Sequence, residues 1–398
     1  MSYPLIELGN LAKFINGDRG KNYPSKDSFV QDGIPFINAG CLSDLWLLDK
    51  SNFNYISEES YGRLSSGKIQ RNDILFCLRG SLGKFAVVRD DEKGALASSL
   101  VILRSNEKIH IEYLKHYLAS HLCQTEINNY QNGAAQPNLS ASDLKKFLIP
   151  LPPLEEQRRI ASILDKADAI RQKRQQAIAK LDELLQATFI DMFGDPLDNP
   201  KKYQMMTLGS ISSFENGDRS NNYPSGADVV QEGIPFLSTK NIKGNFFDSS
   251  NMQFITQEKF NKLSRGKVSN GDILITLRGT LGSTCIYECE YPQAFINAQM
   301  MIIRANQNFM SNRFLHIILS SEAMQKHLKS IGNGAAVQQL TATQLKNISI
   351  ITPDRNNQEI FIKFYESLQN QKSLLKRALN NADDFFKSLQ HRAFNGTL

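Results

Sequence analysis

The stretch Asn16-Gly-Asp-Arg-Gly-Lys-Asn-Tyr-Pro-Ser25 returns as Asn216-Gly-Asp-Arg-Ser-Asn-Asn-Tyr-Pro-Ser225, at an offset of 200 residues. Three further stretches recur in the same order at nearly the same offset: Gly33-Ile-Pro-Phe36, Leu78-Arg-Gly-Ser-Leu-Gly83 and Asn132-Gly-Ala-Ala135. Because this offset is half of the 398-residue length, the chain is a tandem duplication. The sequence therefore predicts one architecture that is built twice.

Each copy begins with a mixed segment of about 150 residues. Apolar runs at Asp73–Leu78 and Ser99–Leu103, bounded by Gly and Asn turns, predict strands. Residues Ile111–Leu122 place apolar side chains at helical spacing, and Phe314–Leu319 matches them in the second copy. The predicted fold class is α+β, with two globular α/β domains at 1–150 and 199–352 and long helices at 151–198 and 353–398.

The two helical segments carry a heptad pattern. The predicted seam is Ile160, Ile163, Ala167, Ile170, Ala177, Leu181 and Leu184 in the first helix and Phe361, Phe364, Leu368, Leu375, Ala378, Ala382, Phe385 and Leu389 in the second, interrupted by Arg174 and Gln371. A stripe this narrow does not stabilise a lone helix in water. We therefore expect an antiparallel intramolecular coiled coil, and a coiled coil between two molecules is the alternative.

Composition narrows the class of protein. The chain is 41% hydrophobic and 22% charged, and no apolar run in it approaches the ~20 residues of a membrane span. Because the first ten residues carry no basic stretch followed by an apolar core, we expect no secretory leader. We expect a cytoplasmic protein without a membrane partner. Five scattered cysteines predict buried, reduced thiols rather than disulfides. Residues 200–352 hold 15 basic and 10 acidic side chains, a surplus that is compatible with nucleic-acid binding.

Catalytic motifs are incomplete. The segment Gly62–Ile69 has the frame of a phosphate-binding loop, but Ile69 stands where Ser or Thr is needed and Asn261 replaces the first Gly in the second copy. His116 and His316 align on predicted helices, without a carboxylate partner common to both copies. The cysteines lack zinc-site spacing. We therefore expect a protein that is not an enzyme and that binds no metal or cofactor itself.

Polar loops recur in both copies. Arg79-Gly-Ser81 and Arg278-Gly-Thr280 directly follow predicted strands. Glycine lets the backbone approach a phosphate, and arginine can bind guanine O6 and N7 together, although a tight hairpin with a solvated arginine is the alternative. The candidate DNA-binding residues are Arg19, Lys21, Asn22, Lys68, Arg79, Ser81, Lys84, Gln136 and Asn138, and in the second copy Arg219, Asn221, Asn222, Lys267, Arg278, Thr280 and Gln338.

Specific motifs at the helices carry a resemblance to a known family. These motifs are Ile149-Pro-Leu-Pro-Pro-Leu-Glu-Glu-Gln157 with Arg158–Ala161, Leu184–Phe189 with Phe193-Gly194, and Ser388–Gly396. With the duplication, they make the whole chain similar to the specificity subunit of type I restriction-modification systems. The resemblance implies two target-recognition domains that each read one half of a bipartite double-stranded DNA site, held apart by the helix pair.

The same resemblance implies partners and cofactors. Two methyltransferase subunits would dock on the helices and bind S-adenosylmethionine, and two restriction subunits would use ATP and Mg. The residues carried over as partner-binding are Leu154, Glu155, Glu156, Gln157, Arg158 and Gln358. The second copy departs from the motif, because Thr352–Gln358 has lost one Pro and both Glu residues. The alternative function is a coiled-coil structural adaptor that does not bind DNA.

Overall fold

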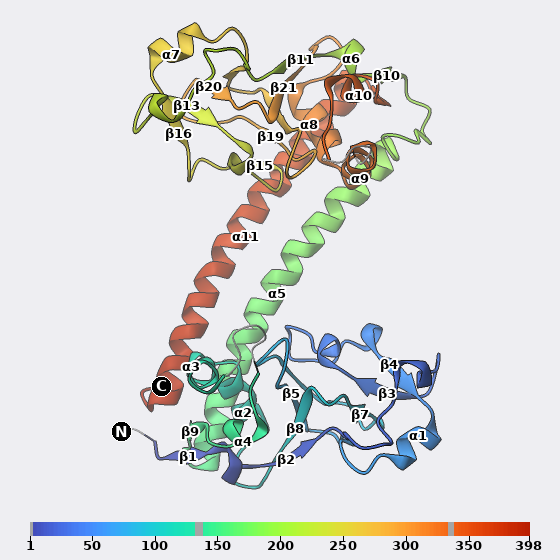
Figure 1. Cartoon of the computed structure of the whole chain (residues 1–398), viewed down its shortest axis with the longest axis vertical. Helices are drawn as coiled ribbons and strands as arrows, with labels where there is room; N and C mark the ends of the chain where they lie inside the picture. The colour runs from blue at the N-terminus through green and yellow to red at the C-terminus, as the bar shows by residue number, and fades with distance from the viewer. Residues whose placement is uncertain (1–2, 132–137, 333–337) are drawn as a thin grey trace. The chain divides into compact units, whose positions relative to one another are not determined.

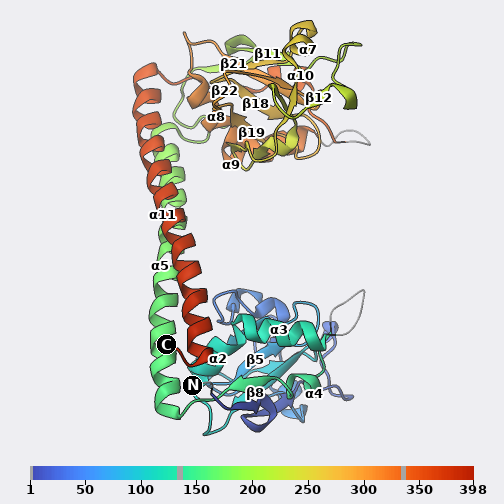
Figure 2. The ribbon, with the colours of Figure 1, turned by 90° about the vertical axis from the view of Figure 1, so that its left-hand side faces the viewer.

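The computed structural model describes residues 3–131, 138–332 and 338–398. The chain forms two compact units, which we call unit 1 (Met1–Ala177 with Leu375–Leu398) and unit 2 (Ile178–Leu374). The long helices α5 (Leu154–Phe193) and α11 (Arg355–Asn395) contribute residues to both units. Within each unit, the segments of α5 and α11 lie side by side and antiparallel (Figure 1, Figure 2). The predicted intramolecular helix pair is confirmed.

Unit 1 combines two small sheets with short helices. The first sheet is antiparallel and has the order β2 (Ala12–Asn16), β8 (Leu100–Ser105), β5 (Ile74–Cys77), β6 (Phe85–Val87). The second has the order β4 (Asn54–Ile56), β3 (Ile34–Ile37), β7 (Ala95–Leu96), with β3 and β7 parallel, and β1 (Leu5–Glu7) pairs with β9 (Leu148–Pro150). The helices are α1 (Glu58–Arg63), α2 (Ile111–Leu118), α3 (His121–Tyr130) and α4 (Ala141–Leu144).

Unit 2 repeats this plan. Its antiparallel sheet has the matching order β11 (Ser212–Asn216), β21 (Met300–Ala305), β18 (Ile273–Thr276), β19 (Thr284–Ile286). The second sheet is β12 (Val229–Val230), β16 (Gln253–Ile255), β13 (Ile234–Leu237), β20 (Gln293–Ile296), β17 (Lys267–Ser269); β10 (Met205–Thr207) pairs with β22 (Ser349–Ile351), and β14 (Ile242–Lys243) with β15 (Phe246–Phe247). The helices are α6 (Leu208–Ile211), α7 (Gln257–Lys262), α8 (Asn312–Ser320), α9 (Glu322–Ile331) and α10 (Ala342–Lys346). The duplication predicted from the sequence is a duplication of the α+β fold.

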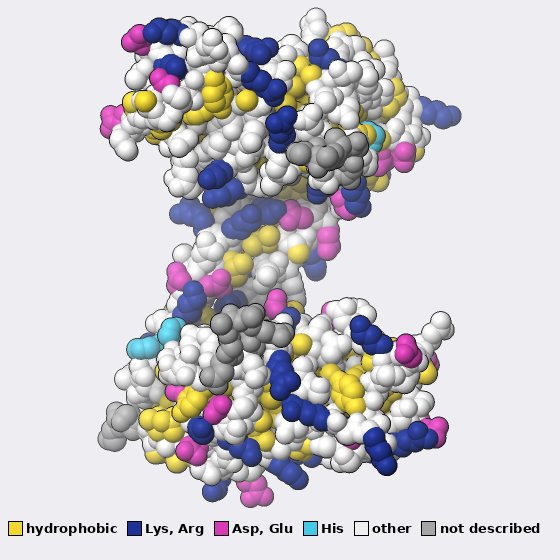
Figure 3. Space-filling model, in the orientation of Figure 1, with side chains coloured by type: hydrophobic (Ala, Val, Ile, Leu, Met, Phe, Trp, Pro, Cys, Tyr) yellow, Lys and Arg dark blue, Asp and Glu magenta, His cyan; other side chains and the backbone are white. Residues whose placement is uncertain are grey.

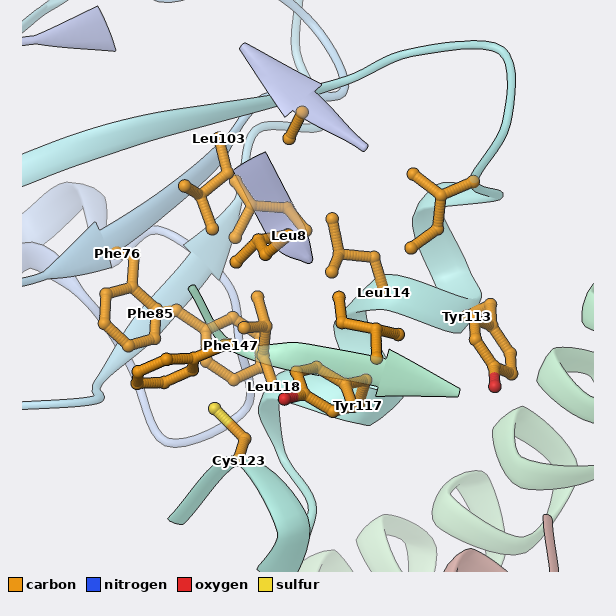
Figure 4. Packing of buried hydrophobic residues seen from close by; sticks show 14 of the residues in the cluster. Leu8, Phe76, Phe85, Leu103, Tyr113, Leu114, Tyr117, Leu118, Cys123 and Phe147 are labelled. Atoms are coloured by element: carbon orange, nitrogen blue, oxygen red, sulfur yellow. The ribbon is translucent and has the colours of Figure 1, made fainter. Parts of the chain in front are cut away.

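One inner strand of each antiparallel sheet, β5 in unit 1 and β18 in unit 2, is buried on both faces and is called the central strand below. In β5, Ile74 and Phe76 pack against the helices, while Leu75 and Cys77 point into a second cluster on the other face. Figure 4 shows Phe76 beside Phe85 and Phe147 within the first cluster. A continuous apolar run is what a strand with two buried faces requires. This burial holds the loop that follows β5 in place.

The seam between α5 and α11 differs from the predicted one at three positions. Ile170, Leu184 and Phe385 were predicted to lie in the seam, but they are 51%, 47% and 59% exposed. The next residue along the helix faces inward in each case, as Phe386 shows with an exposed fraction of 4%. The prediction followed only apolar residues, and it therefore placed Ile170 in the seam where the half-buried polar residue Arg171 lies.

Arg171 is the clearest of these polar residues. Its Nε lies 2.6 Å from Oδ1 of Asp383, a second guanidinium nitrogen lies 2.8 Å from Asp168, and the guanidinium lies over the ring of Phe386 at 4.5 Å. In unit 2, Lys372 pairs with Asp182 across the helices. Ion pairs thus alternate with apolar contacts along the seam.

Candidate nucleic-acid interface

The repeated Asn-Gly-Asp-Arg motif builds the same loop in both units. Oδ1 of Asp18 accepts a hydrogen bond from the Gly20 amide at 2.8 Å, and its Oδ2 accepts from the amide and hydroxyl of Ser65 at 2.8 and 2.9 Å. Asp218 accepts equivalent bonds from Ser264 at 2.8 and 2.9 Å. Burial alone would raise the pKa of Asp218, but its hydrogen bonds hold that pKa below its ordinary value. The aspartate therefore anchors the loop as a carboxylate.

The arginine of the motif lies on the outer side of this loop. Arg19 donates to the carbonyl of Ser98 at 3.1 Å, and Arg219 donates to the carbonyl of Ala298 at 2.9 Å. Both side chains are exposed. The carbonyl of the next residue, Ser99 in unit 1 and Gln299 in unit 2, accepts a hydrogen bond from the amide of the residue that follows β5 or β18. In unit 1, the loop of Arg19 and the loop of Arg79 therefore both contact the turn at residues 98–99. In unit 2, the loops of Arg219 and Arg278 both contact the turn at residues 298–299.

The remaining predicted residues of the first loops divide into two groups. Asn22 and Asn222 donate to backbone carbonyls at 3.0 and 3.3 Å, so they hold the loop. Lys21 and Asn221 are exposed. All four lie beside the arginine of their own loop in the sequence.

The predicted Gly-Lys turn has a structural explanation. Gly67 has φ of 78°, and an added Cβ would lie 2.8 Å from the Cα of Gly17. The ammonium of Lys68 lies 4.8 Å from the ring centre of Tyr61, and that of Lys267 lies 4.9 Å from the ring of Phe260. The turn packs against the first loop and each lysine covers an aromatic ring.

The loop after the central strand joins an arginine to an amide side chain. Nε of Arg79 donates to Oδ1 of Asn138 at 3.1 Å, and Nε of Arg278 donates to Oε1 of Gln339 at 2.9 Å. The structure thus brings together Arg79 and Asn138, which were both predicted. It places Gln339, and not the predicted Gln338, at the position equivalent to Asn138. The sequence alone could have identified Gln339, because Leu139 and Leu340 show that the two copies are offset by 201 residues in this segment.

The tip of this loop is exposed in both units. Gly80 and Gly279 have φ of 79° and 80°, which favours glycine, and the hydroxyl residues Ser81 and Thr280 follow them at the surface. Lys84 forms an ion pair with Asp44 at 3.2 Å. The predicted residue Gln136 lies outside the described residues.

In unit 2 these loops line a hollow of about 230 Å³. The side chains that matter are Arg219, Arg265, Arg278, Asn216 and Gln339, and no Asp or Glu lies among the described residues that line it. Figure 3 shows Lys and Arg side chains in dark blue on this unit's visible face. Sequence reasoning missed Arg265, although it directly precedes the shared Gly-Lys turn. Three guanidinium groups without a carboxylate attract anionic or acceptor-rich ligands.

Two of the residues carried over as partner-binding lie inside the fold. Gln157 is 1% exposed; its Nε2 donates to the carbonyls of Lys108 and Pro152 at 3.0 and 2.9 Å, and its Oε1 accepts from the His110 amide at 2.7 Å. Gln358 is fully buried and makes the equivalent bonds in unit 2. Both amides tie the start of a long helix to the neighbouring α+β part, and they offer no surface to a partner in this conformation.

The other predicted partner residues are at the surface of the first turns of α5. Leu154 is 37% exposed, and Glu155 and Arg158 are also exposed. Glu156 is half-buried and forms two 2.7 Å hydrogen bonds with Arg159. These four residues remain candidates for partner contact.

Replacing Gln358 by Ala is expected to lower the free energy of unfolding by about 2–4 kcal/mol, because three buried or partly buried backbone groups lose their partner. Leu154→Ala, at an exposed position, is the control and should cost less than about 1 kcal/mol. Urea unfolding measures both. Unchanged stability of Gln358→Ala combined with weaker methyltransferase binding would instead place this side chain in a partner interface.

The predicted alignment of His116 with His316 is off by one helical position, and the two histidines occupy different environments. Nε2 of His116 lies 2.8 Å from Oδ1 of Asp165, so this histidine does have a carboxylate partner. His316 stands one helical position earlier, because Tyr113 and Phe314 are the equivalent aromatic residues of α2 and α8. Burial lowers the pKa of His316 to about 4. Neither histidine lines the arginine hollow of unit 2.

Within residues 3–131, 138–332 and 338–398, no group of three or more His, Cys, Asp or Glu side chains could hold a metal ion. In the same part of the chain, no helix has the length and apolarity needed to cross a bilayer. The five cysteines are free thiols, and four of them are buried.

Comparisons with known proteins give a family match over most of the chain. The model of the type I restriction modification DNA specificity domain matches residues 4–180 and again residues 200–382. The specificity subunit of the type I restriction enzyme EcoBI from Escherichia coli is 28% identical over 429 residues, covering 100% of this chain and 86% of that subunit. The MjaVIII specificity subunit from Methanocaldococcus jannaschii is 22% identical over 415 residues, covering 100% and 93%.

Solved structures show the same fold. The crystal structure of a type I restriction-modification S subunit from M. genitalium gives a TM-score of 0.60 at 18% identity and covers 99% of this chain and 96% of that one. A chain from a structural study of complex assembly in the type I system gives 0.57 at 18% identity, covering 100% and 98%. At this identity, the likeness extends to the fold.

Proposed function

This chain belongs to the type I restriction modification DNA specificity subunits, and from that premise we propose that unit 1 and unit 2 each read one half of a bipartite site on double-stranded DNA. A specificity subunit is non-catalytic and directs the type I complex to its recognition site. The proposal concerns which surfaces of the chain meet the DNA and how the halves are divided between the units.

The observation that carries the proposal is the repeated pair of an arginine and an amide. Arg79 with Asn138, and Arg278 with Gln339, hold the arginine through its Nε on an exposed loop. Among the described residues, the terminal guanidinium nitrogens of both arginines have no hydrogen-bond partner. Such a pre-oriented group can donate two parallel bonds to O6 and N7 of guanine. The surrounding lysines and arginines favour the phosphate backbone.

We further propose that the partners supply the chemistry. Two methyltransferase subunits would dock at the exposed first turns of the long helices and bind S-adenosylmethionine, and two restriction subunits would bind ATP and Mg. Leu154, Glu155 and Arg158 support the docking proposal for α5, because they are exposed beside the Gln157 anchor. We propose that the complex acts in the cytoplasm.

Arg79→Ala and Arg278→Ala are each expected to weaken specific DNA binding by about 1–3 kcal/mol, at one position of one half-site. The experiment compares methylation maps of host DNA with the wild-type gene, with each variant and with the gene deleted. We expect one bipartite motif in the wild type, none in the deletion, and relaxed specificity in a different half for each variant.

Arg71→Ala is the matched control for this experiment, because Arg71 is exposed and, among the described residues, its side chain pairs only with Asp91. It should leave the motif unchanged. A map that is unchanged by the gene deletion, together with no salt-dependent DNA binding by the purified complex, would favour a structural adaptor instead.

A further inference from the structure

The arginine hollow of unit 2 differs from its counterpart in unit 1 at one position. The residue before the shared Gly-Lys turn is Arg265 in unit 2 and Ser66 in unit 1. The hydroxyl of Ser66 donates to the carbonyl of Asn16 at 2.7 Å, so it is bound within the loop. Arg265 is exposed and lines the hollow, and it has no hydrogen-bond or ion-pair partner among the described residues.

Nearby carboxylates do not neutralise Arg265. Oε2 of Glu215 lies 2.7 Å from Arg304, and its Oε1 accepts from the Gly266 amide at 2.6 Å. Asp218 accepts from the amide and hydroxyl of Ser264. These two carboxylates, which neighbour the lining residues Asn216 and Arg219 in the sequence, are therefore already bound within the fold.

The other two arginines of the hollow, Arg219 and Arg278, are oriented by hydrogen bonds within unit 2. Arg219 donates to the Ala298 carbonyl at 2.9 Å and Arg278 to Gln339 at 2.9 Å. Three positive groups around about 230 Å³ repel one another until a ligand with electron-rich oxygens or nitrogens enters. Arg265 is the one that no protein contact orients.

We propose that Arg265 gives unit 2 one more arginine contact to DNA than unit 1 has, with a paired acceptor that is either a guanine edge or a phosphate. This inference rests on the proposed function, since it needs both units to bind DNA. Guanine O6 and N7 and two phosphate oxygens present the same paired acceptors to a guanidinium. The two half-sites are therefore bound with unequal strength, although their loops share one architecture.

The test exchanges the two residues. Arg265→Ser and Ser66→Arg are each combined with the methyltransferase partner, and binding is measured on duplexes that carry the mapped motif with every base of each half-site replaced in turn. Arg265→Ser should weaken binding about five- to 150-fold, the range of one bidentate contact. Ser66→Arg should strengthen binding to the half-site of unit 1.

The pattern of loss identifies the acceptor. A loss that disappears when one guanine of the unit 2 half-site is replaced assigns Arg265 to that base. An equal loss on every duplex, with the salt slope reduced by about one, assigns it to a phosphate.

Lys201→Gln removes one positive charge from unit 2 outside the hollow and should change neither the affinity nor the motif. The inference is overturned if wild type binds its motif specifically while Arg265→Ser and Ser66→Arg leave affinity, motif and salt slope unchanged. Failure of the wild-type complex to bind DNA specifically would instead overturn the proposed function, and this inference with it.

Discussion

Deleting residues 174–180 from α5 together with residues 373–379 from α11 is expected to shorten the spacer between the two half-sites while leaving the bases of both half-sites unchanged. Seven residues of helix correspond to about 10 Å, or about three base pairs of DNA. A whole heptad preserves the faces that pack together. The cross-helix contacts Arg171–Asp383 and Lys372–Asp182 lie outside both deleted segments.

Methylation mapping of a host that carries the deletion variant reads out the new spacer directly. The matched control keeps the helix length and replaces the exposed side chains of Gln176 and Lys180 by Ala, and it should retain the native spacer. An unchanged spacer in the deletion variant would contradict the expectation, implied by the family resemblance, that the helix pair holds the two target-recognition domains apart.

Replacing Phe386 by Ala is expected to lower the free energy of unfolding by about 3–5 kcal/mol, whereas Phe385→Ala should cost about 0.5 kcal/mol. The two neighbouring side chains are 4% and 59% exposed. Phe386 packs in the core of unit 1, where the guanidinium of Arg171 covers its ring. Removing it leaves a cavity and also uncovers an ion-paired arginine.

Urea unfolding of the two single variants measures this contrast within one chain. Because the residues are adjacent and chemically identical, differences in helix propensity cancel. A larger loss for Phe385→Ala would mean that α11 is rotated and that the seam predicted from apolar residues alone is correct.

Much of the fold could be predicted from the sequence because its signals are local. The repeated Asn-Gly-Asp-Arg motif predicted two copies of one fold. The apolar run at Asp73–Leu78 contains the observed strand Ile74–Cys77. α5 ends at Phe193, inside the predicted segment 151–198, because Gly194 adopts a φ of 74°. The predicted helix Ile111–Leu122 was broken into α2 and α3, because Ser120 caps a new helix through its hydroxyl.

The missed features depend on contacts between residues that are distant in the chain. Arg171 lies in the seam because it pairs with Asp383 and covers the ring of Phe386, both on the other helix. The pattern of apolar residues along α5 does not indicate these contacts. Gln157 belongs to the motif that carries the family resemblance, but in the structure its side chain forms hydrogen bonds with the carbonyl of Lys108 and the amide of His110. Arg265 shows no motif of its own, and it became a candidate only through the hollow that it lines.

Unit 1 is assembled from both ends of the chain, and this has a consequence for its synthesis. Phe386, Leu389 and Phe394 belong to its core, so unit 1 remains incomplete until the ribosome has translated the second half of α11. Unit 2 is continuous from Ile178 to Leu374, and it is fully translated before unit 1 is. A stop codon within the second half of α11 would therefore damage unit 1, although most of unit 1 is translated before unit 2.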